Sequence, residues 1–123
     1  MIVGIGTDIT EVHRFEKWVN NPVMIERYFN EEEQFSKGTV PSLCQHYAAR
    51  FAAKEAFAKA LGTGICFDLK DVYVKNDISG KPELFFSESV KALLDEKFGN
   101  CSVFVSLSHE KEYAVANVII EKL

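Results

Sequence analysis

The sequence has few cysteines, no long apolar run and no excess of positive charge, and each absence excludes a class of protein. Its three cysteines are odd in number and far from any metal-ligand spacing, so we expect reduced thiols that pack as small core residues. The net charge of −4 gives no global attraction for nucleic acid. No stretch approaches the roughly 18 apolar residues of a membrane span, and the N-terminus lacks the basic region of a signal peptide. We therefore expect a cytoplasmic protein that binds neither nucleic acid nor membrane.

Hydrophobic residues make up 47% of the chain and charged residues 26%, which is the composition of an ordinary folded domain. The length of 123 residues suits a single domain over 1–123 with its own core. Within it, Met1–Thr7 is a short apolar run that predicts a buried strand. Gly4 and Gly6 indicate that another backbone or a ligand approaches this strand closely. The third glycine of a dinucleotide-binding fingerprint is missing, and no P-loop is present.

A long helix is predicted from Ser42, the expected N-terminal cap, to Leu61. No residue in this range breaks a helix, and seven alanines between Ala48 and Ala60 favour one. Gly62 follows directly as the expected C-terminal cap. Because apolar residues occupy most faces of this helix, we expect it to be buried on several sides.

Three charged residues each have a structural and a functional interpretation. Glu55 and Lys59 share one helical face with alanines and a phenylalanine. They form either an i,i+4 ion pair, worth a few tenths of a kcal/mol, or a site where Glu55 holds a metal and Lys59 meets a phosphate. Asp8, which closes the first predicted strand, either caps the next helix or presents its carboxylate to a site. Two carboxylates with few other ligands suit Mg²⁺, which keeps waters and shares substrate phosphates.

The other predicted elements are short helices and two antiparallel hairpins. They are helical segments at 9–19 and, in two pieces with Asn30 capping the second, at 24–37, a hairpin at 67–86, a helix at 88–97 after Ser87, and a hairpin at 102–120 that turns through His109–Glu112. This order predicts an α+β fold in which a largely antiparallel sheet packs on the long buried helix.

Four stretches, in this order and at this chain length, resemble a known family. They are GIGTDI (Gly4–Ile9), RFAAKEAFAKALGTGI (Arg50–Ile65), GKP (Gly80–Pro82) and SLSH…YAVANVI (Ser106–Ile119). The family is the holo-[acyl-carrier-protein] synthases, the small 4′-phosphopantetheinyl transferases, and the resemblance spans nearly the whole chain. It implies the fold of those transferases. It also implies an enzyme that moves the 4′-phosphopantetheine arm of coenzyme A onto a serine hydroxyl of apo acyl carrier protein, releasing adenosine 3′,5′-bisphosphate.

The resemblance also implies roles for individual residues. Asp8 and Glu55 match the family's Mg²⁺ ligands, with the diphosphate of coenzyme A completing the shell, and both count as catalytic residues. Either Glu55 or a metal-held water takes the serine proton, and the sequence does not choose between them. Lys59 matches a catalytic lysine that faces the diphosphate. Contacts to the nucleotide or its 3′-phosphate are implied for a further set of residues: Arg50, Gly62, Gly64, Lys81 and His109.

Family members act as homotrimers with each site at a subunit junction, and the apolar final strand is compatible with that. They bind the acidic carrier protein through several arginines of the first helix, where this chain offers Arg14 and Lys17, with Arg27 nearby. We therefore expect weak or salt-sensitive docking. The alternatives are a non-catalytic module that binds coenzyme A or a carrier protein, and a transferase acting on carrier domains of polyketide or peptide synthases.

Overall fold

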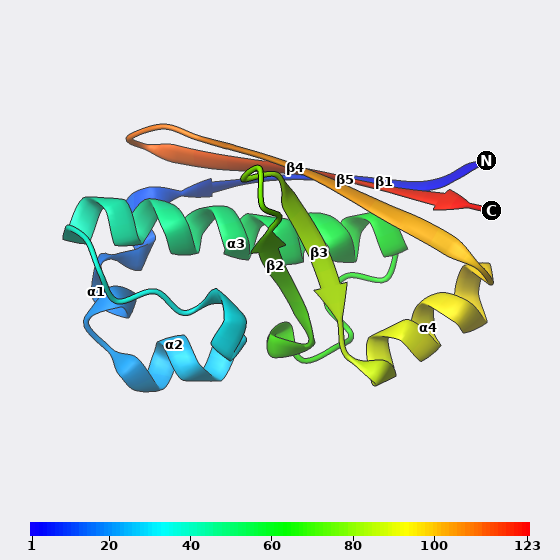
Figure 1. The fold of residues 1–123 in the computed structure, drawn as a ribbon, viewed down its shortest axis with the longest axis horizontal. Coiled ribbons are helices and arrows are strands. Elements are labelled where there is room, and N and C mark those ends of the chain that lie inside the picture. Colours follow the sequence, from blue (N-terminus) through cyan, green and yellow to red (C-terminus); the bar gives the residue numbers. More distant parts are fainter.

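One long helix, α3 (Val40–Leu61), runs along a three-stranded sheet, and most other elements pack against it (Figure 1). The computed structural model describes all residues from 1 to 123. The other elements, in chain order, are β1 (Ile2–Glu11), η1 (Val12–Phe15), α1 (Glu16–Val19), α2 (Pro22–Tyr28), η2 (Glu31–Glu33), η3 (Leu69–Asp71), β2 (Val72–Asn76), β3 (Pro82–Phe86), α4 (Glu88–Phe98), β4 (Cys101–His109) and β5 (Tyr113–Lys122). The predicted α+β fold is confirmed.

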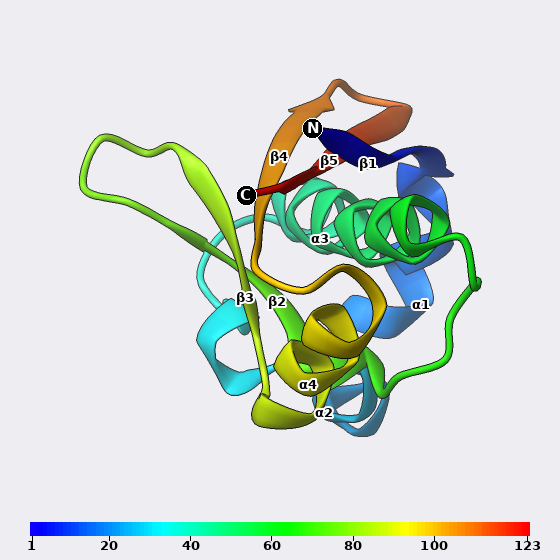
Figure 2. The same cartoon turned by 90° about the vertical axis from the view of Figure 1, so that its right-hand side faces the viewer.

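The larger sheet has the order β1-β5-β4, and both pairings are antiparallel. Strands β2 and β3 form a separate two-stranded hairpin. Figure 2, which looks nearly along α3, shows the larger sheet on one side of the helix and α2 and α4 on the other. The β2–β3 hairpin projects away from the helix in the same view. The larger sheet therefore has one face covered by α3.

Helix α3 is buried on several sides, as predicted, and 13 of its 22 residues are buried. Alternate residues of β5 pack on it, because successive side chains of a strand point to opposite faces: Ala114, Ala116, Val118 and Ile120 are all fully buried. On its other sides lie two groups of apolar side chains. One surrounds Phe57 and Leu61 beside β2, β3 and α4, and the other surrounds Phe15, Phe29 and Phe51 beside η1 and α2.

The two glycines of β1 lie directly against the backbone of α3. A Cβ atom added at Gly6 would fall well under 3.0 Å from the carbonyl oxygen of Ala56, and one added at Gly4 would meet that of Ala60 in the same way. The predicted close approach of another backbone is confirmed. Only glycine permits this spacing between strand and helix.

Strand β1 is longer than predicted, which changes the place of Asp8. The strand pairs with β5 from Ile2 to Glu11, and Asp8 stands opposite Ala116 within the ladder. Asp8 therefore does not cap a helix, and that interpretation is wrong. The predicted helix at 9–19 is reduced to the short η1 and α1. The cause is a tertiary contact. Strand β5 provides hydrogen-bond partners for the backbone groups of the residues that precede η1, so these residues extend the strand.

Three other local predictions also differ from the structure. Helix α3 begins at Val40 and is capped by Thr39, whose hydroxyl accepts a hydrogen bond from the Ser42 amide at 3.2 Å, so Ser42 is not the cap. His109 ends β4 opposite Ala114 and precedes the turn. Cys66 is exposed, so it is not a core residue. Asn30 does cap a helical turn, as predicted, but the turn covers only Glu31–Glu33.

None of the helices is both long enough and apolar enough to span a membrane.

Candidate active site

The alternation of β1 turns Asp8 toward α3. Gly4 and Gly6 face the helix, and because side chains alternate along a strand, Asp8 and Thr10 share that face. Asp8 is half-buried there. The Thr10 hydroxyl donates a hydrogen bond of 2.7 Å to Oδ2 of Asp8, which fixes the orientation of the carboxylate.

Lys59 reaches from α3 to the same carboxylate. Its Nζ donates to Oδ1 of Asp8 at 3.1 Å and to the carbonyl oxygen of Thr7 at 3.0 Å. No ion pair joins Lys59 to Glu55, since Lys59 pairs only with Asp8. The interpretation of Glu55 and Lys59 as an i,i+4 helix pair is therefore wrong. The lysine links the helix to the strand.

Glu55 lies within electrostatic range of Asp8. Its pKa is raised, first by burial and then by the negative charge of Asp8, while the positive charges of Lys59 and Arg14 oppose the rise. The two carboxylates are half-buried and repel each other, and cationic side chains lie around them. A divalent cation bound between them would relieve that repulsion.

The donor set fits Mg²⁺ better than a metal that needs a complete protein cage. No three histidine, cysteine, aspartate or glutamate side chains are arranged so that together they could hold a metal ion. Two carboxylates leave most positions of an octahedral ion to water and to substrate oxygens, which is how Mg²⁺ is usually bound.

Arg14 and Lys17 lie on the segment that directly follows β1. Both are exposed. The guanidinium of Arg14 stands over the Phe51 ring of α3 at 5.4 Å from its centroid, a contact that holds the arginine beside the helix. Because the charge of Arg14 also acts on Glu55, the exposed basic segment borders the carboxylate pair.

Arg50 faces another side of α3. At about 100° per residue, Arg50 and Lys59 lie on opposite sides of the helix. The Nη1 atom of Arg50 donates to the carbonyl oxygen of His46 at 3.4 Å, and its Nε is buried without a hydrogen-bond partner. The charges of Arg50 and His109 both lower the pKa of His46, so these three residues belong to one neighbourhood.

The remaining predicted residues lie in exposed turns. Gly62 caps α3 with φ of 80°, and Gly64 follows with φ of 69°. Lys81 stands at the turn of the β2–β3 hairpin, where its amide donates to Asp77 at 2.9 Å. Within one chain, the structure bonds Lys59 to Asp8 and places Glu55 in range of both charges. It does not gather the predicted nucleotide contacts around them.

The sequence reasoning missed two features of this region. One is the Thr10 hydroxyl that bonds to Asp8, and its signal was the spacing of two residues, which puts Thr10 and Asp8 on the same face of a strand. The buried ion pair of Glu33 and Lys54 was not predicted either. Its signals were a lysine inside the alanine-rich helix and a glutamate three residues after the Asn30 cap.

The chain belongs to the 4′-phosphopantetheinyl transferase superfamily, whose family model matches residues 4–118. Within it, the chain is similar to holo-[acyl-carrier-protein] synthases. That of Treponema denticola is 51% identical, with 98% of this chain and 99% of the relative covered. The crystal structure of the Bacillus anthracis enzyme in complex with CoA (3′,5′-ADP) is 41% identical, with a TM-score of 0.81 and coverage of 100% and 99%. The structure from Neisseria meningitidis is 36% identical, with a TM-score of 0.83 and coverage of 99% and 100%.

Proposed function

We propose that this chain transfers the 4′-phosphopantetheine arm of coenzyme A to a serine hydroxyl of apo acyl carrier protein and releases adenosine 3′,5′-bisphosphate. The observation that carries the proposal is the Asp8–Lys59 ion pair, with the charges of both acting on Glu55, in a chain that matches the family from residue 4 to residue 118. The similar B. anthracis structure is a complex with CoA (3′,5′-ADP).

In this proposal Asp8 and Glu55 hold Mg²⁺. When bound there, the ion neutralises charge on the diphosphate and on the leaving phosphate. The Thr10 hydroxyl keeps Asp8 oriented. The side chain of Lys59 is 53% exposed. Beyond its bonds to Asp8 and Thr7, the Lys59 ammonium has a third N–H with which to balance charge on the diphosphate oxygens. The serine proton passes to Glu55 or to a water beside it.

The proposed nucleotide contacts are Arg50, Gly62, Gly64, Lys81 and His109. The Arg50 Nε has no protein partner although it is buried, and a buried unpaired donor is a reason to look for a ligand. An anion is the natural partner of a guanidinium. We assign the 3′-phosphate of the nucleotide to this neighbourhood.

We also propose a homotrimer in which neighbouring copies complete each site, because one chain holds Arg50 and Lys59 on opposite sides of α3. The outer face of the β1-β5-β4 sheet supports this. It carries Ile5, Ile9 and Phe104 with exposed fractions of 69%, 64% and 51%. Neighbouring exposed apolar side chains of this kind mark an interaction surface.

The proposed partner is an acidic acyl carrier protein that docks on Arg14 and Lys17. Fatty acid synthesis in the cytoplasm is the proposed setting, and the three unpaired cysteines agree with a reducing compartment.

The decisive experiment incubates apo carrier protein with coenzyme A and Mg²⁺, with and without a chelator, and follows the mass of the carrier protein. One added phosphopantetheine is expected only with Mg²⁺. Glu55→Gln and Asp8→Asn should abolish the gain, because each removes one charge from the metal pair with little change in shape. Glu88→Gln, the same change at an exposed residue of α4, is the control and should keep it. Coenzyme A binding without any product would favour a non-catalytic module instead.

A further inference from the structure

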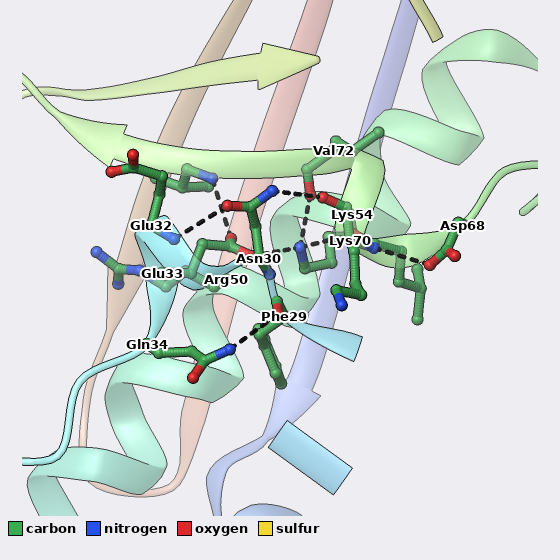
Figure 3. A network of polar contacts seen from close by, with 12 residues as sticks. Phe29, Asn30, Glu32, Glu33, Gln34, Arg50, Lys54, Asp68, Lys70 and Val72 are labelled. Atoms are coloured by element: carbon green, nitrogen blue, oxygen red, sulfur yellow. Dashed lines mark hydrogen bonds and ion pairs between the residues drawn. The ribbon is translucent and has the colours of Figure 1, made fainter. Parts of the chain in front are cut away.

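A fully buried lysine on α3 makes contacts that the proposed chemistry does not use. The side chain of Lys54 is 0% exposed, and so is that of its partner Glu33. The Nζ of Lys54 donates to Oε1 of Glu33 at 2.6 Å and to the carbonyl oxygens of Leu69 at 2.8 Å and Val72 at 2.5 Å. Figure 3 shows this network between α3, η2 and the start of β2.

Glu33 is as fully bonded as Lys54. Its Oε1 also accepts from the Asn30 amide at 3.1 Å, and its Oε2 accepts from the Val74 amide at 3.0 Å. A buried ion pair is weak evidence for stability, because desolvation of both charges offsets their attraction and an apolar pair of similar volume often does as well. The pair can instead serve to hold the backbone segment to which Lys54 is bonded.

The pair holds the short segment where the chain returns to α3. Lys54 binds the carbonyls of Leu69 and Val72, and the Asn30 side chain donates to the carbonyl of Lys70 at 3.0 Å. A single 3-10 turn such as η3 leaves most of its carbonyls without partners. Side chains from α3 and from the Asn30 cap supply them.

This returning segment closes the exposed loop Gly62–Asp68. The loop starts at the end of α3, where the Gly62 amide donates to the carbonyl of Lys59 at 3.0 Å, and it ends at η3, which Lys54 holds. Both ends are thus attached to the same helix. Inside the loop the side-chain hydrogen bonds are local, from Thr63 to Gly64 and between Thr63 and Cys66. Near the returning end, the Phe67 ring packs on Phe57 of α3, with the ring centroids 5.6 Å apart. The place of the loop therefore depends on its two ends, where Gly62 on one side and Phe67 and η3 on the other attach it to that helix.

We propose that Lys54 and Glu33 are positioning residues for nucleotide binding: they hold the returning end of the Gly62–Asp68 loop so that its backbone stays where coenzyme A docks. This inference rests on the proposed function, which assigns Gly62 and Gly64 to the nucleotide. The affinity for coenzyme A should then depend on the buried pair. The docking of the carrier protein should not, because the proposed docking residues lie on η1 and α1.

The test uses the double variant Glu33→Gln/Lys54→Met, because Lys54→Met alone leaves a buried carboxylate without its partner and risks loss of folding. The dissociation constant for coenzyme A, measured by calorimetry, should rise roughly tenfold to a hundredfold, as expected when a binding element is displaced. The KM for carrier protein should stay within about twofold of the parent value.

A stability-matched control separates positioning from a general loss of structure. Leu94→Ala truncates a buried side chain of α4 and removes none of the hydrogen bonds through which Lys54 holds η3 and the start of β2. It should lower the melting temperature but leave the affinity for coenzyme A unchanged. Equal losses of affinity in Leu94→Ala and the double variant, at equal melting temperature, would overturn the inference.

Hydrogen exchange of the loop amides distinguishes the two proposals. Faster exchange at residues 62–68 in the double variant, together with weaker coenzyme A binding, supports the inference. Unchanged exchange, with coenzyme A bound as tightly as by the parent, overturns the inference alone. Failure of the parent chain to bind coenzyme A overturns the proposed function and this inference with it.

Discussion

At the scale of single residues, Gly6 decides how closely the carboxylate of β1 meets the helix. Its missing side chain lets the strand lie on the carbonyl of Ala56. We expect Gly6→Ala to lower the free energy of unfolding by about 1–3 kcal/mol, because the new methyl group must displace backbone. Transferase activity should fall with it, since Asp8 moves away from Glu55 and Lys59. Urea unfolding and the mass assay measure the two effects.

A double variant tests the reason for this loss. The added methyl group meets a backbone oxygen, so Gly6→Ala/Ala56→Gly, which removes a side chain from the opposing helix, should not recover stability or activity. Recovery in the double variant would mean that side-chain crowding, and not backbone contact, sets the spacing.

His46 is a second residue whose surroundings have a measurable consequence. Its Nε2 lies 2.7 Å from the carbonyl oxygen of Glu33, so Nε2 carries the proton and donates. Burial first, then the charges of Arg50 and His109, lower the pKa of His46 from 6.5 to about 4. The folded protein therefore keeps His46 neutral at a pH where the unfolded chain protonates it.

The sign of the pH dependence follows from that difference. Between about pH 6.5 and about pH 4 the unfolded state binds more protons through His46, so this residue lowers stability as the pH falls. The loss amounts to at most about 3 kcal/mol. His46→Gln keeps a donor for the Glu33 carbonyl and does not titrate, so its stability should fall less between neutral pH and about pH 4. Urea unfolding at several pH values measures this, and parallel curves for the two proteins would contradict it.

At the scale of elements, η1 and α1 bring basic side chains to the edge of the carboxylate pair. We expect Arg14→Glu to raise the KM for carrier protein roughly tenfold and to leave that for coenzyme A nearly unchanged, because it reverses one charge of the proposed docking surface. The effect should shrink as salt is added. Lys97→Glu on α4 is the matched control, an equal charge reversal on another element. Equal KM values for carrier protein in parent and Arg14→Glu would reject the proposed docking surface.

The elements themselves were predictable to different degrees. Helix α3 could be read from its alanines and from Gly62, because helix propensity and capping are local properties. The two hairpins were also found, since short turns join their strands. The extension of β1 to Glu11 could not be read locally, because its backbone partners in β5 are distant in the chain.

At the scale of the whole molecule, the outer face of the larger sheet is the surface that a trimer would cover. We expect the parent protein to have the mass of three chains in sedimentation equilibrium. Ile5→Asp should shift it toward one chain, because a charge buried in an apolar interface loses its water. Transfer should be lost too, since each site would lack residues from its neighbour. Val23→Asp, at a 72% exposed residue of α2, should leave mass and activity unchanged. A single-chain mass for the parent would reject the trimer.

The sequence by itself determined helix α3, the two hairpins and the family that the four motifs indicate. It also determined that another backbone lies close to Gly4 and Gly6. These depend on neighbouring residues or on motif order. Only the tertiary structure decided that Lys59 bonds to Asp8 and not to Glu55, that Asp8 lies within a strand, and that Lys54 and Glu33 form a buried pair. Each of those outcomes joins residues far apart in the chain, where the partner is chosen by packing and by the need of buried charges for hydrogen bonds.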